Sequence, residues 1–169
     1  FPSKVSMSGD SDWAGDMVSR KSTSGIIAMF GRHLIAGKSN LQSTIAMSSC
    51  EAEFYAMTKA TATGLFLRAI LDDWGFGDVE LEVGTDSSSA KAFGERRGLG
   101  KNRHVQTKFL WIQERIATKD MKLIKVNTKN NLADIMTKSL GVADLHRHLK
   151  NMSLEFRELK SSKQKSLLH

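Results

Sequence analysis

Four acidic residues stand where predicted strands end or predicted helices begin, so their side chains could meet although they are far apart in the sequence. Asp10 and Asp86 each close a predicted strand. Asp134 lies in the first turn of a short helical segment, and Glu53 lies near the start of a long one. Carboxylates gathered at one edge of a sheet repel one another unless cations or protons lie between them. Because hard divalent cations such as Mg²⁺ prefer oxygen ligands, the four residues are candidates for a metal site.

Ordinary structural roles are open for the same residues. Asp10 and Asp12 could be turn residues before Gly15. Asp86, which precedes three serines, could cap a helix. Asp134 could interact favourably with the dipole of its helix. Position alone does not decide between these roles and metal binding.

The long helix, predicted from Ser49 to Asp73, allows a distinction between two of its own carboxylates. Ser48 and Glu51 form a capping box, with the serine as N-cap and the glutamate three residues later. Glu53 projects about 200° away from Glu51, since each helical residue advances about 100°. Glu51 therefore has a structural role, which leaves Glu53 available for chemistry.

The remaining sequence pattern predicts a mixed α/β sheet. Apolar stretches at Ile26–Phe30 and His33–Ala36 flank a turn at Gly31-Arg32, which is typical of a hairpin. A preceding strand is expected at Val5–Asp10. The other expected elements are a strand at Val79–Thr85, a helix at Ser87–Phe93, a basic loop at Arg96–Arg103, a helix at Val105–Thr118, a strand at Leu123–Val126 and a short helix at Leu132–Leu140.

Composition is that of one globular domain and excludes several other classes of protein. The 169 residues are 40% hydrophobic, and no apolar run approaches the roughly 18–20 residues that span a bilayer.

The single cysteine, Cys50, rules out an internal disulfide and indicates a reducing compartment. Zinc spacing, the Gly-x-Ser-x-Gly nucleophile motif and the ending of a phosphate-binding loop are all missing from the sequence. Because the chain begins with Phe1 and shows no signal-peptide pattern, we expect a piece of a longer protein.

Charge is distributed unevenly along the chain. The net charge is +7, from 25 Lys and Arg against 18 Asp and Glu. Residues 1–100 hold 10 basic and 12 acidic residues, whereas residues 101–169 hold 15 and 6. An acidic part that binds cations, joined to a basic part that meets a polyanion, would explain this distribution, as would a solvated basic surface. We expect one domain over residues 1–154 and a basic, disordered tail over residues 155–169.

Four segments in chain order match the motifs of one known family. They are residues 10–16 (Asp-Ser-Asp-Trp-Ala-Gly-Asp), 48–56 (Ser-Ser-Cys-Glu-Ala-Glu-Phe-Tyr-Ala), 85–90 (Thr-Asp-Ser-Ser-Ser-Ala) and 133–138 (Ala-Asp-Ile-Met-Thr-Lys). With these segments, roughly residues 5–154 resemble the ribonuclease H domain of copia-type LTR retrotransposons. The corresponding family motifs are Ser-Asp-x-Asp-Trp-Ala-Gly-Asp, Ser-Ser-Thr-Glu-Ala-Glu-Tyr-x-Ala, Cys-Asp-Asn-Gln-Ser-Ala and Ala-Asp-Ile-Leu-Thr-Lys.

The resemblance implies an α/β ribonuclease H-like fold, a five-stranded mixed sheet flanked by helices. It also implies an active site in which four carboxylates are both catalytic and metal-binding, namely Asp10, Glu53, Asp86 and Asp134. Asp10 is preferred over Asp12 because it holds the first Asp of its motif. Glu53 is preferred over Glu51 because the residues that follow it match those after the family's catalytic glutamate, in agreement with the capping-box argument.

The activity implied by the resemblance is hydrolysis of the RNA strand of an RNA–DNA hybrid. It would use two Mg²⁺ ions about 3.5–4 Å apart, with Mn²⁺ able to substitute. Contacts to 2′-hydroxyls would select the RNA strand, and basic side chains would bind phosphates. Our candidates for these contacts are Ser22, Ser24, Ser87, Ser88, Lys101, Arg103 and His104. The chain departs from the family at two of these places, where Ser87-Ser88 replaces Asn-Gln and residues 101–104 replace Arg-Thr-Lys-His.

The partners implied by the resemblance are the hybrid and the reverse transcriptase domain of the same polyprotein. The expected location is the cytoplasm, including virus-like particles, and no membrane partner is expected. Two alternatives remain open. One is a decayed or repurposed copy that binds nucleic acid without cutting it, against which the retention of all four carboxylates argues. The other is a structural segment of the polyprotein that does not bind the hybrid by itself.

Overall fold

The structure, a computed structural model, describes residues 2–98 and 110–155 and is built around a central sheet. The sheet has five strands in the order β3-β2-β1-β4-β5. The bounds of these strands are Lys4–Asp12 (β1), Thr23–Phe30 (β2), His33–Leu41 (β3), Glu80–Thr85 (β4) and Lys122–Lys125 (β5). The β1–β2 and β2–β3 pairs are antiparallel, whereas the β1–β4 and β4–β5 pairs are parallel. This mixed sheet confirms the predicted fold class.

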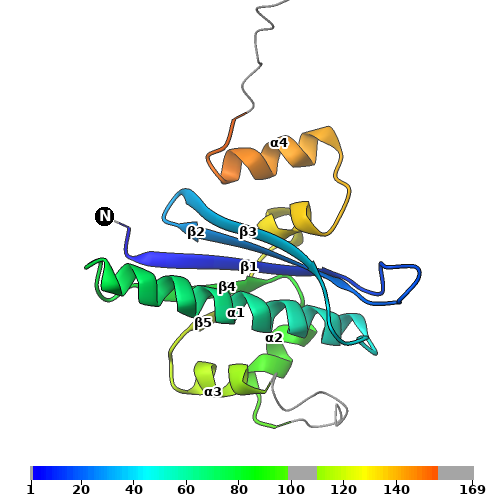
Figure 1. Ribbon diagram of the computed structural model, residues 1–169, viewed down its shortest axis with the longest axis horizontal. Helices are drawn as coiled ribbons and strands as arrows, with labels where there is room; N and C mark the ends of the chain where they lie inside the picture. Colours follow the sequence, from blue (N-terminus) through cyan, green and yellow to red (C-terminus); the bar gives the residue numbers. More distant parts are fainter. Residues whose placement is uncertain (1, 99–109, 156–169) are drawn as a thin grey trace, which may run out of the picture.

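Helices cover both faces of the sheet (Figure 1). One face bears α1 (Ser49–Asp73), α2 (Ser88–Glu95) and α3 (Trp111–Ala117). The opposite face bears a short 3₁₀ helix, η3 (Leu132–Met136), and α4 (Val142–Asn151), and a further 3₁₀ turn, η2 (Thr128–Asn130), precedes η3. Among the described helices, none combines the length and apolarity required to cross a membrane.

Strand β2 is buried on both of its faces, which explains the uninterrupted apolar stretch in its sequence. Ile26 and Phe30 belong to the core beneath α1. Ile27 and Met29 point to the other side, where they form a second cluster with Met152, and residues of η3 and α4 pack against it. Because side chains alternate across a strand, both sheet faces need apolar residues here. The two clusters hold α1 and η3 on opposite sides of β1 and β2.

Helix α1 lies close to the sheet because its inner face contains small residues. Ala56 and Ala60 are fully buried. A Cβ atom added at Gly64 would come within 2.5 Å of Leu81 Cδ1 and 2.8 Å of Met7 Cγ, so these side chains would have to shift to admit a larger residue. The close approach brings the first turns of α1 beside the C-terminal end of β1.

The observed elements differ from the predicted ones mainly at their ends. β1 and β3 extend to Asp12 and Leu41, beyond the predicted ends, because antiparallel pairing with β2 continues through polar residues. The helix predicted at Leu132–Leu140 is instead the shorter 3₁₀ helix η3. The helix predicted at Val105–Thr118 is described only from residue 110 onward, where α3 begins at Trp111.

Helix α4 is absent from the predicted elements. It is mostly polar, and His148 is its one buried residue. Its partly buried Leu149 packs on the second cluster, together with Met152 just beyond the helix. The helix packs on a surface formed by residues that are distant in the sequence. Of the tail predicted over residues 155–169, residues 156–169 lie outside the described residues.

Candidate metal centre

Asp10 lies in the central strand β1, and contacts with Thr137 and Lys138 restrict the position of its carboxylate. Its side chain is 2% exposed. It accepts a hydrogen bond from the Thr137 hydroxyl, and the Lys138 ammonium lies 3.3 Å from its carboxylate. Burial raises the pKa of Asp10 to about 6, although the hydrogen bond from Thr137 and the charge of Lys138 act in the opposite direction.

Glu53 extends from the second turn of α1 toward the end of β1. Its Oε1 accepts hydrogen bonds from the backbone N–H and the hydroxyl of Ser11, each 3.0 Å long. Its Oε2 is buried and has no hydrogen-bond partner within residues 2–98 and 110–155. Burial raises the pKa of Glu53 to about 8, and the charge of Asp10 adds to the rise. A buried carboxylate oxygen without a partner is costly unless a cation or proton accompanies it.

Asp86 immediately follows β4, at the edge of the sheet where β1 and β4 run parallel. The Thr85 hydroxyl accepts a hydrogen bond from the Ser87 N–H at 3.1 Å, and the Lys125 ammonium donates to the Asp86 backbone oxygen. These contacts hold the turn that follows the strand. The Asp86 side chain remains partly exposed.

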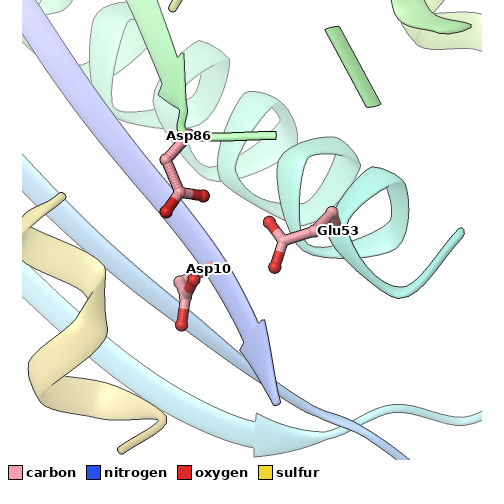
Figure 2. Close-up of side chains that lie close together, drawn as sticks. All are labelled: Asp10, Glu53 and Asp86. Atoms are coloured by element: carbon pink, nitrogen blue, oxygen red, sulfur yellow. The ribbon is translucent and has the colours of Figure 1, made fainter. Parts of the chain in front are cut away.

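The three carboxylates converge, although they come from three different elements. One oxygen each from Asp10, Glu53 and Asp86 lies within 4.8 Å of the others. Figure 2 shows the three side chains directed toward a common space between β1, the end of β4 and α1. A set of only oxygen donors, one of them buried without a partner, fits a hard divalent cation. The residues that could hold such an ion are these three.

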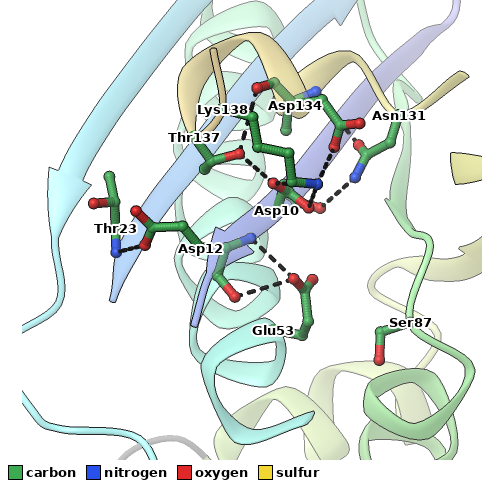
Figure 3. Close-up of polar contacts among 12 residues, drawn as sticks. Asp10, Asp12, Thr23, Glu53, Ser87, Asn131, Asp134, Thr137 and Lys138 are labelled. Atoms are coloured by element: carbon green, nitrogen blue, oxygen red, sulfur yellow. Dashed lines mark hydrogen bonds and ion pairs between the residues drawn. The ribbon is translucent and has the colours of Figure 1, made fainter. Parts of the chain in front are cut away.

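Asp134 is arranged differently from the other three predicted ligands. It lies in η3 with a side chain 11% exposed, and Lys138, one turn later, forms an ion pair with it at 2.9 Å. The same ammonium contacts Asp10, so Lys138 bridges the two carboxylates (Figure 3). Burial lowers the pKa of Lys138, but the hydrogen bond to Asp134 and the charges of both aspartates outweigh it and raise the value. Asp134 is thus beside the cluster, with a lysine between it and Asp10.

Two further residues attach η3 to the site. Asn131, fully buried, donates from its side chain to the Gly9 backbone oxygen at 3.2 Å and accepts from the Ala133 N–H at 3.3 Å. Gly25 pairs with Asp10 across the sheet, and a Cβ atom there would come 2.8 Å from the Ala133 backbone oxygen. The sequence analysis did not identify Asn131, Ser11, Thr137 or Lys138 as part of the site. Thr137 and Lys138 do belong to the motif at residues 133–138 that contains Asp134.

The two carboxylates set aside by the sequence analysis have structural partners. Asp12 accepts a hydrogen bond from the Thr23 N–H across the β1–β2 pair. Glu51 accepts from the Met47 N–H at 2.9 Å and from the Tyr55 hydroxyl, and Ser48 caps the helix through the Glu51 N–H at 3.2 Å. Asp12 and Glu51 are therefore engaged in contacts within the protein, whereas Asp10 and Glu53 approach Asp86.

The predicted substrate contacts fall into three groups. Ser22 and Ser24 are buried, and their hydroxyls accept hydrogen bonds from the Ala14 N–H and the Gln42 amide, so neither is available at the surface. Ser87 is partly exposed as the N-cap of α2, and Ser88 is exposed beside it. Lys101, Arg103 and His104 lie outside the described residues.

Two solved structures have a fold similar to that of this chain. The N-terminal RNase H domain of a Mycobacterium tuberculosis protein aligns with 87% of this chain and 96% of that chain at 15% identity, with a TM-score of 0.51. RNase H1 from the archaeon Halobacterium salinarum aligns with 79% of this chain and 93% of that chain at 18% identity, with a TM-score of 0.53. The five-stranded mixed sheet with its helices is therefore a ribonuclease H-like fold.

Proteins with similar sequences indicate the family to which this ribonuclease H-like chain is related. The chain is 32% identical over 130 residues to the retrovirus-related Pol polyprotein from transposon TNT 1-94 of Nicotiana tabacum, a match over 76% of this chain. It is 26% identical over 139 residues to that from transposon RE1 of Arabidopsis thaliana, a match over 78% of this chain. No family model matches the sequence. The homologues of this chain are retrovirus-related Pol polyproteins of plant copia-type transposons, as the motifs predicted. The chain spans only about a tenth of the length of these relatives, 10% and 9% respectively.

Proposed function

We propose that this domain hydrolyses the RNA strand of RNA–DNA hybrids with the help of divalent metal ions, Mg²⁺ in the first place. The observation that supports the proposal best is the convergence of Asp10, Glu53 and Asp86 within 4.8 Å, with one buried oxygen of Glu53 unpartnered among the described residues. Homology to Pol polyproteins and the ribonuclease H-like fold favour this chemistry over other uses of a carboxylate cluster.

Each side chain of the cluster has a definable task in this proposal. Ser11 fixes one oxygen of Glu53 and directs the other toward Asp10 and Asp86. Thr137 orients Asp10, and the turn after β4 places Asp86 at the exposed side. Bound divalent ions would supply an activated water and neutralise charge that develops on the phosphate and the leaving oxygen. We expect a first ion between Asp10, Glu53 and Asp86, and a second that also engages Asp134.

The proposed substrate fits the surface beside the cluster. Ser87 and Ser88 follow Asp86 directly and are accessible to a strand whose phosphate lies at the carboxylates. Their hydroxyls could donate to or accept from the 2′-hydroxyls that distinguish RNA from DNA. We further propose Lys101, Arg103 and His104 as phosphate contacts, the reverse transcriptase domain of the same polyprotein as partner, and the cytoplasm or virus-like particles as the place of action.

The test is cleavage of a labelled RNA–DNA hybrid by the full chain in Mg²⁺, comparing wild type with Asp86→Asn. We expect the wild type to cut only the RNA strand, the variant to lose cutting, and EDTA to abolish it. Asp144→Asn is the matched control, because Asp144 is an exposed carboxylate of α4 that pairs with Arg147. Its cleavage should equal that of the wild type.

Hybrid binding in Ca²⁺ separates the remaining possibilities. Binding without cutting in Mg²⁺ would indicate a decayed or repurposed nucleic-acid-binding domain. Failure to bind the hybrid at all would indicate a structural segment of the polyprotein. Equal cutting by wild type and Asp86→Asn would contradict the assignment of the metal site.

A further inference from the structure

A groove between α1 and the edge strand β3 is lined by two lysines. It has a volume of about 400 Å³, and the buried residues Ser24 and Ile26 of β2 lie at its inner side. Lys38 and Asn40 of β3 line one side, and Lys59 and Thr63 of α1 line the other. Strand β3 is an edge strand of the described sheet, next to β2. Lys38 and Asn40 are exposed, and Lys59 and Thr63 are partly exposed, so the groove is open to solvent.

The charges of this groove are unbalanced. None of the described residues that line it is acidic. Among the ion pairs of residues 2–98 and 110–155, none includes Lys38 or Lys59, whereas Lys4, Lys91, Lys122 and Lys138 all have carboxylate partners. Lys59 is partly buried, and burial together with the nearby charge of Lys38 lowers its pKa. The ammonium groups of Lys38 and Lys59 repel each other and have no acidic neighbour in the described lining. This arrangement, beside the side chains of Asn40 and Thr63, favours binding of an anion.

The groove lies beside the carboxylate cluster. Ser24 pairs across the sheet with Ser11, whose backbone N–H and hydroxyl both donate to Glu53. Lys59 follows Glu53 by six residues on α1, which corresponds to about 9 Å along the helix axis. Since successive charges of one strand in a duplex are about 3.4 Å apart along the axis, this distance corresponds to roughly two or three nucleotides.

We propose that the Lys38–Lys59 groove binds a backbone phosphate of the nucleic-acid substrate, roughly two or three nucleotides from the phosphate held at the carboxylates. This inference rests on the proposed function and adds a contact site to it. The lysines provide charge, while Asn40 and Thr63 provide hydrogen-bond donors. Because such a contact involves no base edge, it would be independent of sequence.

The experiment uses the double variant Lys38→Met/Lys59→Met in the full chain, because methionine keeps most of the aliphatic stem of lysine. The matched control is Lys4→Met/Lys122→Met, which removes the same charge from two lysines paired with Glu82 and Glu80. Binding of a labelled hybrid is measured in Ca²⁺ over a series of salt concentrations. For the groove variant we expect affinity to fall on the order of tenfold at low salt and the slope of log K against log salt to flatten by about one.

In Mg²⁺, the groove variant should show a raised KM with kcat unchanged, because the groove holds substrate away from the reacting atoms. Both double variants should keep the wild-type melting temperature within a few degrees. Displacement of the hybrid by inorganic phosphate at constant ionic strength would indicate a site for a small anion and would overturn the assignment to a polymer backbone.

The outcomes also separate this inference from the function on which it rests. If the wild type binds and cuts the hybrid while the groove variant behaves like the control, the groove is not a phosphate site and the proposed function stands. If the wild type does not bind the hybrid, both proposals are wrong.

Discussion

The carboxylates at the edge of the sheet form two arrangements that differ in what balances their charge. On the α1 side, Glu53 and Asp86 approach Asp10, and no lysine or arginine of residues 2–98 and 110–155 forms an ion pair with either of them. On the η3 side, Lys138 lies between Asp134 and the same Asp10. Asp10 thus belongs to both arrangements, and one of them is neutralised by the protein itself.

The difference indicates what each side requires from a bound ion. On the α1 side, burial of Glu53 must be offset by a proton or a metal, and its raised pKa of about 8 reflects that demand. On the η3 side, the Lys138 ammonium balances the charges of Asp10 and Asp134, so neither a bound metal ion nor a proton is required. A metal that engages Asp134 would therefore have to compete with Lys138, whereas one bound by Glu53 and Asp86 would not.

The largest effect on hybrid cleavage is expected from removing the negative charge of Glu53 on the α1 side. Glu53→Gln should lower the hybrid-cleavage rate by at least about a hundredfold, because loss of a metal ligand removes several kcal/mol of transition-state stabilisation. In EDTA the same variant should melt at a higher temperature than wild type, because a buried carboxylate is gone. Glu51→Gln, two residues away, should leave cleavage within a few-fold and cost about 1 kcal/mol through its contacts with Met47 and Tyr55. Equal losses of cleavage in the two variants would remove the distinction between these glutamates.

The next largest effect concerns pH in the absence of metal. Because the pKa of Glu53 rises from an ordinary 4.5 to about 8 in the folded protein, its protonated form favours folding. That contribution is complete below about pH 4.5 and is lost as pH rises through 8, so metal-free stability should fall over this interval. Because water has partial access to the Glu53 carboxylate, the free energy of unfolding should fall by only on the order of 3 kcal/mol. Asp10, with a pKa of about 6 against an ordinary 3.8, acts in the same direction at lower pH.

Melting temperatures in EDTA from pH 5 to pH 9 test this expectation. The gap between wild type and Glu53→Gln should widen as pH rises and should shrink when Mg²⁺ is added, since the metal favours the ionised carboxylate. A constant gap across this range would show that Glu53 does not titrate there.

The α1 side of this comparison could be predicted from sequence more completely than the η3 side. The capping box at Ser48 and Glu51 fixes the rotation of α1, so the direction of Glu53 follows from helical geometry. Asp10 and Asp86 end predicted strands, and parallel neighbours bring such ends together. Local patterns therefore determine most of this arrangement.

The η3 side depends on contacts that no local pattern contains. Lys138 and Asp10 are 128 residues apart, and their ion pair requires η3 to lie against β1 and β2. That position depends on the buried Asn131 and on the second apolar cluster, to which the unpredicted α4 contributes. The burial of Ser22 and Ser24 follows equally from tertiary pairing, which is why their expected surface role has no support in the structure.

A smaller effect on stability and cleavage is expected from moving η3, which carries Asp134, away from the sheet. Gly25→Ala would place a Cβ atom 2.7 Å from Met136 Cβ and 2.8 Å from Thr137 Cγ2, so η3 must move away from β2. Overpacking of this kind costs about 1–3 kcal/mol, and cleavage should also decrease because Thr137 no longer orients Asp10. Gly141→Ala is the control, because nothing lies within 4 Å of its added Cβ. Unchanged melting and cleavage in Gly25→Ala would show that η3 is not packed tightly on β2.

The smallest effect, and the one that distinguishes the two arrangements most directly, is expected from Lys138→Met. Without the ammonium, Asp10 and Asp134 repel each other, but the lysine side chain is 41% exposed, so the cost in EDTA should be only about 1–2 kcal/mol. Ca²⁺ should recover most of that loss and should bind the variant more tightly than wild type, because the competing cation is gone. Lys122→Met, from an exposed pair with Glu80, should change stability by less than about 0.5 kcal/mol with or without Ca²⁺. If Ca²⁺ fails to recover the loss in Lys138→Met, the lysine is a structural contact alone, and the two arrangements do not compete for the same charge.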